Sequence, residues 1–330
     1  MKRLASEPSA SDSFLTRYPV RMIVIRVVAV SCLALFAFAV ADDSKSNFVT
    51  LTGAPGLTES SGLSFSMSDP ACVWTHNDSG DRARLFCFDT RSGRLTGTCE
   101  LTSAKSVDWE AMTGVPASTD APAKLIVADC GDNNAVREHI TLYRFAEPDP
   151  HAQTRLDLAD YESLQVRFPN GAVDCEAVWY DPDENCTVLL AKGRLPIAAV
   201  FTVSDSSWTS ADAAKRHALR KNNSPRKSGL GPHRVTASQI ATLALPMATG
   251  ADRDARSGDV WIASYFQAFC FERGRHSSLQ EQLGGVPRAV EMPRLRQVEA
   301  IAVDSGSRVW VTTEGSPALL HPLSTETPTQ

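Results

Sequence analysis

The sequence lacks the short motifs that most readily identify an enzyme. It contains no GxSxG elbow, no HExxH pair, no Walker loop and no GxGxxG turn, which removes the local signals of serine hydrolases, zinc proteases and nucleotide-binding enzymes. It contains no CxxC pair either, which disfavours a structural zinc site. Helical periodicity is nearly absent after residue 41, which argues against a helical fold. What remains is a chain of short strands and conspicuous acidic residues.

The first 41 residues differ from the rest. Residues 22–41 have a basic start, an apolar run and an Ala-Val-Ala ending, which is the pattern of a secretory signal peptide. The apolar run from Val27 to Val40 is short for a membrane span. We therefore predict a signal peptide over residues 1–41, with Met22 as a candidate start, and a mature protein that begins at Ala41 or Asp42 and is exported to the periplasm or the cell exterior. An uncleaved N-terminal anchor is the alternative.

Acidic residues outnumber basic ones. The whole chain carries a net charge of −5, and removal of five basic and two acidic residues with the signal peptide leaves 28 basic and 36 acidic residues, a net charge of −8. A chain of this charge is not expected to bind nucleic acid.

Cysteine is moderately frequent. Seven cysteines follow residue 41 (Cys72, Cys87, Cys99, Cys130, Cys175, Cys186 and Cys270), and export would permit disulfides. The odd number leaves at least one free thiol in a monomer. Cys87 and Cys99 flank a predicted hairpin and form the best local pair.

Short apolar runs separated by turn residues dominate the mature chain. Runs such as KLIVAD, ITLYRF, TVLLAK and RVWVTT are rich in β-branched and aromatic residues and are bounded by Asp, Ser, Gly and Pro, which is typical of strands and turns. They group into five units of roughly four strands each, at 57–101, 107–168, 172–245, 248–292 and 297–320. Units that recur in this way predict an all-β fold, a β-propeller.

The last unit is one strand short, and Asn47 to Gly53 forms an orphan strand at the other end of the mature chain. Supplying that strand to the last blade would close the ring and remove exposed edges. We predict a single domain over residues 42–330 with five blades; six blades is the alternative if the long third unit hides one. The basic segment at 204–234 is expected to be a solvated insertion, with a nucleic-acid or membrane contact as the alternative.

An acidic residue opens the first strand of each unit, as in VDWEAM, VDCEAV and QVEAIAV. If these first strands are innermost, the acids converge on one mouth of the central channel. Clustered carboxylates raise each other's pKa or recruit a cation, and calcium, which prefers oxygen ligands, is the natural candidate. The predicted calcium ligands are Glu59, Asn77, Glu110, Glu176, Asp252 and Glu299. The alternative is that each acid caps its own hairpin.

Antiparallel pairing also predicts the neighbours of these acids. Glu59 is expected near Asn77 and Asp78, Glu110 near Asp129 and Asp132, Glu176 near Lys192 and Arg194, Asp252 near Tyr265, and Glu299 near Glu314. Lys192 and Arg194 would neutralise Glu176 without a metal.

His76 and Asp78 are the predicted catalytic residues. His76 precedes Asn77 and Asp78 at the expected mouth, where it could act as a base, and Asp78 is a carboxylate that could activate water. A hydrogen-bonded structural histidine is the alternative.

The segments LTESSGLSFS, WTHNDSGDRARLFCFD, VDWEAM, VADCGDNN, ITLYRFAEP, VDCEAV, ATGADRD and QVEAIAV together resemble a family of exported bacterial β-propeller proteins, most of whose members have no assigned activity. The chain is more distantly similar to gluconolactonase-type, strictosidine-synthase-like and phytase-like propellers. That resemblance implies acidic and amide side chains around the axis that hold calcium. Cys130 and Cys175 depart from the family pattern, which leaves open a disulfide that braces the face.

Two classes of function follow. The first is a calcium-dependent hydrolase of lactone, ester or phosphoester substrates. The second is a non-catalytic binding or scaffold propeller for a glycan, peptide or protein, and the fold does not choose between them. We expect a monomer with a small-molecule or glycan ligand and no membrane span after signal cleavage.

Overall fold

The computed structural model describes residues 48–193, 196–208 and 233–324. The predicted signal peptide, Arg194 and most of the basic segment at 204–234 lie outside the described residues. The chain divides into two compact units, and everything described belongs to the second, residues 46–330. No helix within the described residues is long and apolar enough to cross a membrane.

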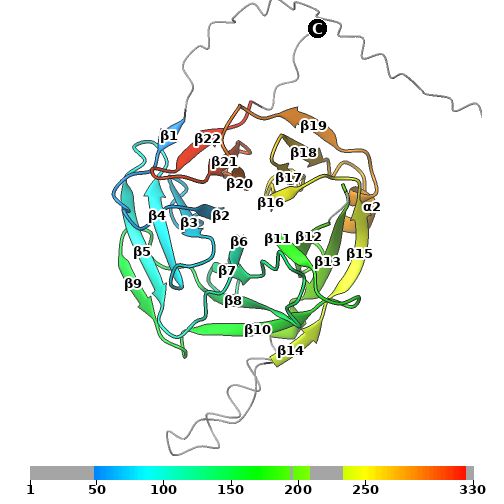
Figure 1. Cartoon of the computed structure of the whole chain (residues 1–330), viewed down its shortest axis with the longest axis horizontal. Coiled ribbons are helices and arrows are strands. Elements are labelled where there is room, and N and C mark those ends of the chain that lie inside the picture. Colours follow the sequence, from blue (N-terminus) through cyan, green and yellow to red (C-terminus); the bar gives the residue numbers. More distant parts are fainter. Residues whose placement is uncertain (1–47, 194–195, 209–232, 325–330) are drawn as a thin grey trace, which may run out of the picture. The chain divides into compact units, whose positions relative to one another are not determined.

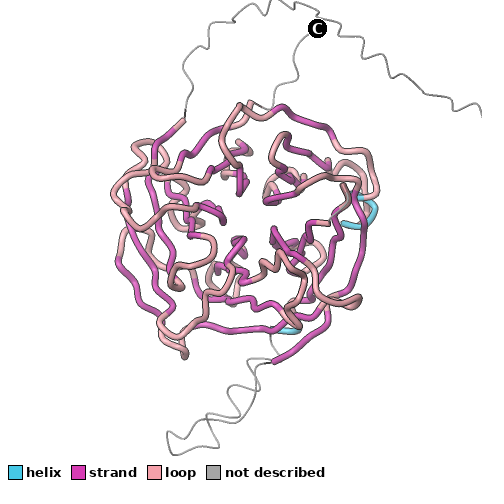
Figure 2. Tube along the Cα trace, viewed as in Figure 1, coloured by secondary structure: helices cyan, strands magenta, loops and turns pink. Residues whose placement is uncertain are grey.

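Within the described residues, twenty-two strands form five sheets around a central axis (Figures 1 and 2). Blade 1 contains β2 (Ser60–Phe65), β3 (Cys72–Asn77), β4 (Arg84–Asp89), β5 (Leu95–Leu101) and β9 (Gln153–Leu156). Blade 2 contains β6 (Trp109–Val115), β7 (Lys124–Asp129), β8 (Ile140–Ala146), β10 (Tyr161–Arg167) and β14 (His233–Thr236). Blade 3 contains β11 (Asp174–Asp181), β12 (Cys186–Lys192), β13 (Ala198–Ser204) and β15 (Ser238–Leu243).

Blade 4 contains β16 (Ala248–Arg253), β17 (Val260–Ser264), β18 (Gln267–Phe271) and β19 (Arg288–Glu291), with helix α2 (Leu279–Leu283) between its last two strands. Blade 5 contains β20 (Val298–Val303), β21 (Val309–Thr313), β22 (Leu319–Pro322) and β1 (Val49–Thr50). The first strand of every blade is innermost, and each inner strand contacts the inner strands of both neighbouring blades. The prediction of a five-bladed propeller is confirmed.

The ring is closed by the N-terminal strand, as predicted. β1 pairs antiparallel with β22, so that Val49 stands opposite Leu320 and Thr50 opposite Leu319. Blade 5 thus takes three strands from the C-terminal part of the chain and its outer strand from residues close to the predicted cleavage site. The exposed edge of β22 is covered in this way.

Two outer strands were not predicted. β9 pairs parallel with β5 of blade 1, and β14 pairs parallel with β10 of blade 2. Both lie in connections between strands of a different sheet, β9 between β8 and β10 and β14 between β13 and β15. Each therefore ties a later part of the chain back to the preceding blade.

The hydrophobic core is divided into five clusters, one between each pair of adjacent blades. One cluster, for example, joins Ile126 and Leu142 of blade 2 to Val178 and Leu189 of blade 3. Side chains alternate across a strand, so each blade contributes one face to each neighbour. Inter-blade packing of this kind leaves the axis free for polar residues.

All seven cysteines of the propeller are buried free thiols. The predicted pair of Cys87 and Cys99 is wrong: Cys87 stands opposite Gly97 and Cys99 opposite Leu85. Their offset on β4 and β5 places both in the apolar cluster between blades 1 and 2.

Candidate cation site at the axial mouth

The inner strands share a β-bulge close to their starts. The pairing register skips Glu110 in β6, Glu176 in β11, Thr249 in β16 and Glu299 in β20, and in β2 the skip covers Ser61 and Gly62. A bulge leaves the extra residue out of the ladder and re-aims its side chain. We refer to Ser61, Glu110, Glu176, Thr249 and Glu299 as the bulge ring.

A small residue follows each member of the bulge ring, namely Gly62, Ala111, Ala177, Gly250 and Ala300. The inner strands approach closely there: a Cβ atom on Gly250 would lie 3.0 Å from the Ala300 Cα atom of the next blade. In the recurrent Glu-Ala pair of the sequence, the glutamate is thus the bulge residue, and the alanine is small enough for neighbouring inner strands to approach closely.

The bulge register corrects two of the predicted ligands. Asp252 is three residues past the bulge residue Thr249, and it stands opposite Trp261 rather than near Tyr265. Its carboxylate accepts hydrogen bonds from the backbone N–H groups of Val303 (2.8 Å) and Arg253 (2.8 Å). Asp252 therefore braces blade 4 against blade 5 and does not join the acids of the mouth.

Glu59 is also displaced from the predicted position, because Ser61 occupies its place in the bulge ring. Glu59 forms a backbone bridge to Glu314, and its carboxylate charge contributes to the raised pKa of Glu314, after the larger effect of burial. It precedes its bulge residue by two positions, as Asp108 precedes Glu110 and Asp174 precedes Glu176. Glu59, Asp108 and Asp174 thus form a second tier of acids.

Three carboxylates from two blades meet at the mouth. Asp78 follows β3, and Asp108 and Glu110 lie at the start of β6; one carboxylate oxygen from each lies within 4.8 Å of the other two. Asp78 and Asp108 are partly exposed, whereas Glu110 is buried. The Ser61 hydroxyl donates to the Glu110 backbone oxygen (2.9 Å) and lies 3.3 Å from Glu110 Oε2.

Two acids of this cluster, Glu110 and Asp108, have raised pKa values. Burial, with the added charges of Glu176 and Asp78, raises the pKa of Glu110 to about 10. Burial, with the charge of Asp78, raises the pKa of Asp108 to about 6. Raised pKa values of this kind mark carboxylates that lack a sufficient positive partner.

The Glu176 carboxylate has a partner of its own. Lys192 Nζ lies 2.5 Å from Glu176 and 3.5 Å from Asp174, in agreement with the predicted proximity. Burial nevertheless raises the pKa of Glu176 to about 8. Although burial opposes it, the Glu176 carboxylate keeps the pKa of Lys192 above its usual range.

Glu299 and Glu314 share one end of blade 5, as predicted. Burial, followed by the charge of Glu314, raises the pKa of Glu299 to about 7, and Asp78 contributes to the same shift. Tyr265, from the end of β17, lies in the field of the Glu299, Glu176 and Glu314 carboxylates, and burial raises the pKa of its hydroxyl to about 12.

Several of the predicted neighbours serve the hairpins themselves. Asp129 accepts hydrogen bonds from the Asp108 backbone N–H group (3.1 Å) and from Arg137 (2.8 Å). Asp132 accepts from the Arg137 backbone N–H group (2.6 Å). For Asp129 and Asp132, the capping alternative describes the contacts.

The Asn77 amide is likewise fully used. Its oxygen accepts from the backbone N–H groups of Thr58 (2.9 Å) and Glu59 (3.1 Å), and its nitrogen donates to Gly56 (2.6 Å) and Asp81 (2.7 Å). Asn77 therefore shapes the loop before β2, and its oxygen is not available to an ion.

His76 lies inside the wall between blades 1 and 2, not on the mouth. Its exposed fraction is 0%, its ring meets the Trp109 ring edge-on at 5.4 Å, and Nδ1 is 2.8 Å from the Asn77 backbone oxygen. Burial lowers the pKa of His76. These contacts fit the structural alternative, because a substrate at the mouth could not reach the ring.

Four residues of the mouth were missed in the sequence: Ser61, Asp108, Asp174 and Thr249. Asp108 and Asp174 carry a visible signal, since both belong to a Val-Asp-x-Glu-Ala repeat at 107–111 and 173–177. Thr249 has none, but its buried hydroxyl has no hydrogen-bond partner among the described residues. An unpaired buried oxygen in the bulge ring is available to a ligand.

No protein-family model matches the chain, and no curated protein matches it. Similar solved structures include a gluconolactonase from Xanthomonas campestris, with 13% identity, a TM-score of 0.41 and coverage of 81% of this chain and 87% of that one. A glucose dehydrogenase structure has 9% identity, a TM-score of 0.46 and coverage of 84% of this chain and 99% of that one. A streptogramin B lyase structure has 9% identity, a TM-score of 0.40 and coverage of 84% of this chain and 100% of that one. Likeness at this level carries no argument about activity, which has to be inferred from the residues of the mouth.

Proposed function

We propose that the protein is a calcium-dependent hydrolase of a lactone, ester or phosphoester, with the cation held by Asp78, Asp108 and Glu110. The supporting observation is the convergence of these three carboxylates within 4.8 Å at the channel mouth. Their donor atoms are all oxygen, which suits a hard cation and disfavours a soft one.

The raised pKa values at the mouth favour the cation hypothesis over the hypothesis that each acid only caps its own hairpin. Burial raises the pKa of Glu110 to about 10 and that of Asp108 to about 6. None of the hairpin contacts described above requires either acid to carry a proton. A divalent ion would replace the proton of Glu110 and offset the repulsion among the three acids. The Ser61 hydroxyl, beside Glu110, adds a further oxygen at the same place.

The remaining residues of the mouth can supply proton transfer. A calcium ion bound there would polarise the carbonyl or phosphoryl oxygen of a substrate. Glu299, with a pKa of about 7, is ionised in part near neutral pH and can accept a proton from an attacking water. Tyr265, whose hydroxyl stays protonated to about pH 12, can donate a hydrogen bond to a substrate oxygen.

Near-neutral acids favour catalysis over passive binding. Glu299 and Glu176, with pKa values of about 7 and 8, can change protonation state during turnover, as residues of catalytic sites often do. The catalytic role that the sequence assigned to His76 passes in this proposal to Glu299, and Asp78 becomes a cation ligand.

Two measurements test the proposal. Thermal unfolding of the mature protein in chelator and in millimolar calcium should differ, because an ion that binds only the folded state stabilises it by about 2.7 kcal/mol at a hundred times its dissociation constant. Asp78→Asn and Glu110→Gln should lose that shift. Glu291→Gln, which changes an exposed acid on β19, should keep it.

Activity is measured on a panel of lactones, aryl esters and phosphomonoesters with and without calcium. Calcium-dependent turnover that is lost in Glu299→Gln, while the calcium shift in melting remains, is the expected result. Identical melting in both media would rule out the cation. A calcium shift with no turnover on any substrate class would favour the binding or scaffold alternative instead.

A further inference from the structure

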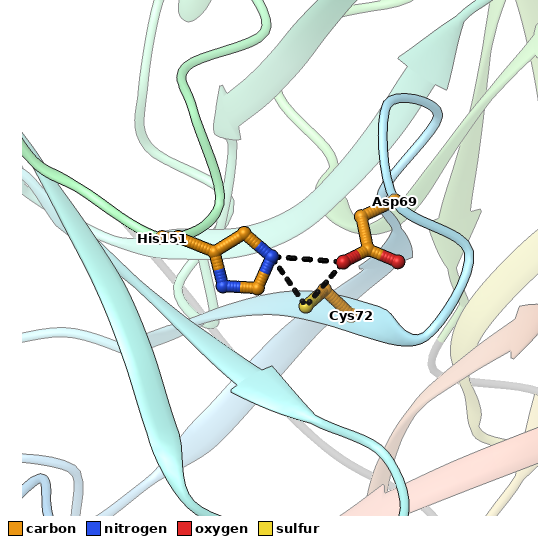
Figure 3. A group of neighbouring side chains, drawn as sticks. All are labelled: Asp69, Cys72 and His151. Atoms are coloured by element: carbon orange, nitrogen blue, oxygen red, sulfur yellow. Dashed lines mark hydrogen bonds and ion pairs between the residues drawn. The ribbon is translucent and has the colours of Figure 1, made fainter.

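A second group of metal-ligating side chains lies at the opposite end of blade 1. β2 starts and β3 ends at the mouth, so the connection from Phe65 to Cys72 is at the far end of the hairpin. Asp69 belongs to this connection, Cys72 is the first residue of β3, and His151 lies in the segment just before β9. Figure 3 shows the three side chains directed toward one another.

The three ligand atoms form a small triangle. His151 Nε2 lies 2.8 Å from Asp69 Oδ2 and 3.9 Å from Cys72 Sγ, and Cys72 Sγ lies 3.7 Å from Asp69 Oδ2. Tetrahedral zinc, with bonds of 2.0 to 2.3 Å to oxygen, nitrogen and sulfur, requires separations of about 3.3 to 3.6 Å between ligand atoms. The sulfur distances are therefore within about 0.3 Å of that geometry, and the histidine and aspartate need to separate by about 0.5 Å.

A catalytic triad would be arranged differently. In a Cys-His-Asp triad the carboxylate orients one imidazole nitrogen and the thiol faces the other. Here both Asp69 Oδ2 and Cys72 Sγ face Nε2, so the ring cannot relay a proton between them. Sulfur, nitrogen and oxygen atoms that face one another are instead donors that zinc accepts.

The surrounding backbone builds this triangle. Asp69 Oδ1 accepts the Ala71 backbone N–H group (3.0 Å), which leaves Oδ2 to face the site. His151 is brought there by the parallel pairing of β9 with β5. Gly97 permits the close approach, because a Cβ atom at that position would lie 2.5 Å from the Pro150 backbone oxygen and 2.8 Å from that of Ala152.

The site is open on one side. The side chains of His151 and Asp69 are 55% and 36% exposed, so an ion can enter from solvent, while the thiol lies buried behind them. An exposed His–Asp pair alone contributes little to stability and does not account for the thiol beneath it.

We propose that Asp69, Cys72 and His151 form a zinc site, with a water molecule as the fourth ligand. Sulfur and imidazole donors select zinc over calcium or magnesium. The ion would tie the segment before β9 to blade 1, at the end of the blade remote from the axial mouth. No local sequence pattern reveals this group, because His151 lies 79 residues after Cys72 along the chain.

Metal binding to the purified full-length or mature protein tests this directly. We expect one zinc ion per chain by elemental analysis after dialysis, and a cobalt-substituted protein with a thiolate-to-cobalt charge-transfer band. Cys72→Ser should abolish the band, and His151→Ala and Asp69→Asn should each weaken zinc binding at least tenfold, since even loss of an outer-shell partner costs that much. Cys270→Ser and His276→Ala, a buried thiol and an exposed imidazole on blade 4, should bind as the parent does.

Three results would overturn the proposal. One is a zinc affinity that the three ligand variants leave unchanged. Another is a cobalt spectrum without a thiolate band. The third is a disulfide between Cys72 and the adjacent Cys87, detected by mass spectrometry of the unreduced protein, since it would leave no thiol for the ion.

Discussion

Replacing Glu110 by glutamine should stabilise the cation-free protein at neutral pH. Burial and the neighbouring acids raise the pKa of Glu110 from 4.5 to about 10 in the folded state. A carboxyl group of this kind does not destabilise the protein below its pKa in the unfolded state. As the pH rises from that value toward its pKa in the folded state, the group lowers the free energy of unfolding by a growing amount. Between pH 4.5 and pH 7 the cost reaches about 3 kcal/mol, at about 1.4 kcal/mol for each unit. Glutamine keeps the shape of the side chain and removes this cost.

The assay is urea unfolding in chelator, at about pH 5, 7 and 8.5, with the free energy obtained by linear extrapolation. Glu110→Gln and the parent should be nearly equal at the lowest pH. The variant should be more stable by about 3 kcal/mol at pH 7, with a wider gap at the highest pH. Glu291→Gln should follow the parent throughout, because that side chain is exposed on β19.

Calcium at a hundred times its dissociation constant should close most of this gap, because the binding free energy of about 2.7 kcal/mol nearly offsets the cost of about 3 kcal/mol. The parent then gains the free energy of ion binding, which replaces the proton of Glu110, and the variant does not. Parallel pH curves for Glu110→Gln and the parent in chelator would refute the reasoning, since they would show that Glu110 ionises in the folded protein with no unusual cost.

Four further predictions follow from the same contacts. Calcium binding at pH 7 should release about one proton, that of Glu110, measured as a difference in binding enthalpy between buffers of unlike ionisation enthalpy. Gly62→Ala should lower the free energy of unfolding by about 1–3 kcal/mol, because its Cβ would lie 2.1 Å from His76 Nε2; an unchanged denaturation midpoint would contradict the packing described. Deleting residues 47–53 should expose the edge of β22 and lower the melting temperature, with oligomers on gel filtration; an unchanged monomer would show that β1 is dispensable. Mass spectrometry of the protein from an exporting host should find an N-terminus at residue 41 or 42, and an intact chain would count against export.

Repetition in the sequence predicted the blades because each blade is a local unit. Strands of five to eight residues, bounded by Asp, Gly and Ser, were visible one by one. The closing strand was found by counting, since the last unit was one strand short. The partners of β9 and β14 could not be found in this way, because parallel pairing with the preceding blade depends on segments about 50 residues or more apart, and no local pattern records it.

The sequence predicted that acidic residues lie at the mouth, but it assigned two of the positions to the wrong residues. Glu59 and Asp252 resemble Glu110 in the sequence, since each is an acidic residue close to a short apolar run. The bulge decides which residue leaves the ladder, and a shift of one position moves a side chain to the other face of the strand. Ser61 and Thr249 hold the equivalent positions, although neither is acidic. The bulge itself is a property of the paired strands, so the sequence of one strand does not reveal it.

The two proposed metal sites make a joint prediction, because they lie at opposite ends of blade 1 and differ in donor chemistry. The mouth offers only oxygen, and the group at Asp69, Cys72 and His151 offers oxygen, nitrogen and sulfur. Calcium should therefore stabilise the parent and Cys72→Ser equally, and zinc should stabilise the parent and Glu110→Gln equally. Melting of the parent and both variants in chelator, calcium and zinc provides the test. If Cys72→Ser also abolished the calcium shift, the two groups would be coupled through the blade, and independent sites would be excluded.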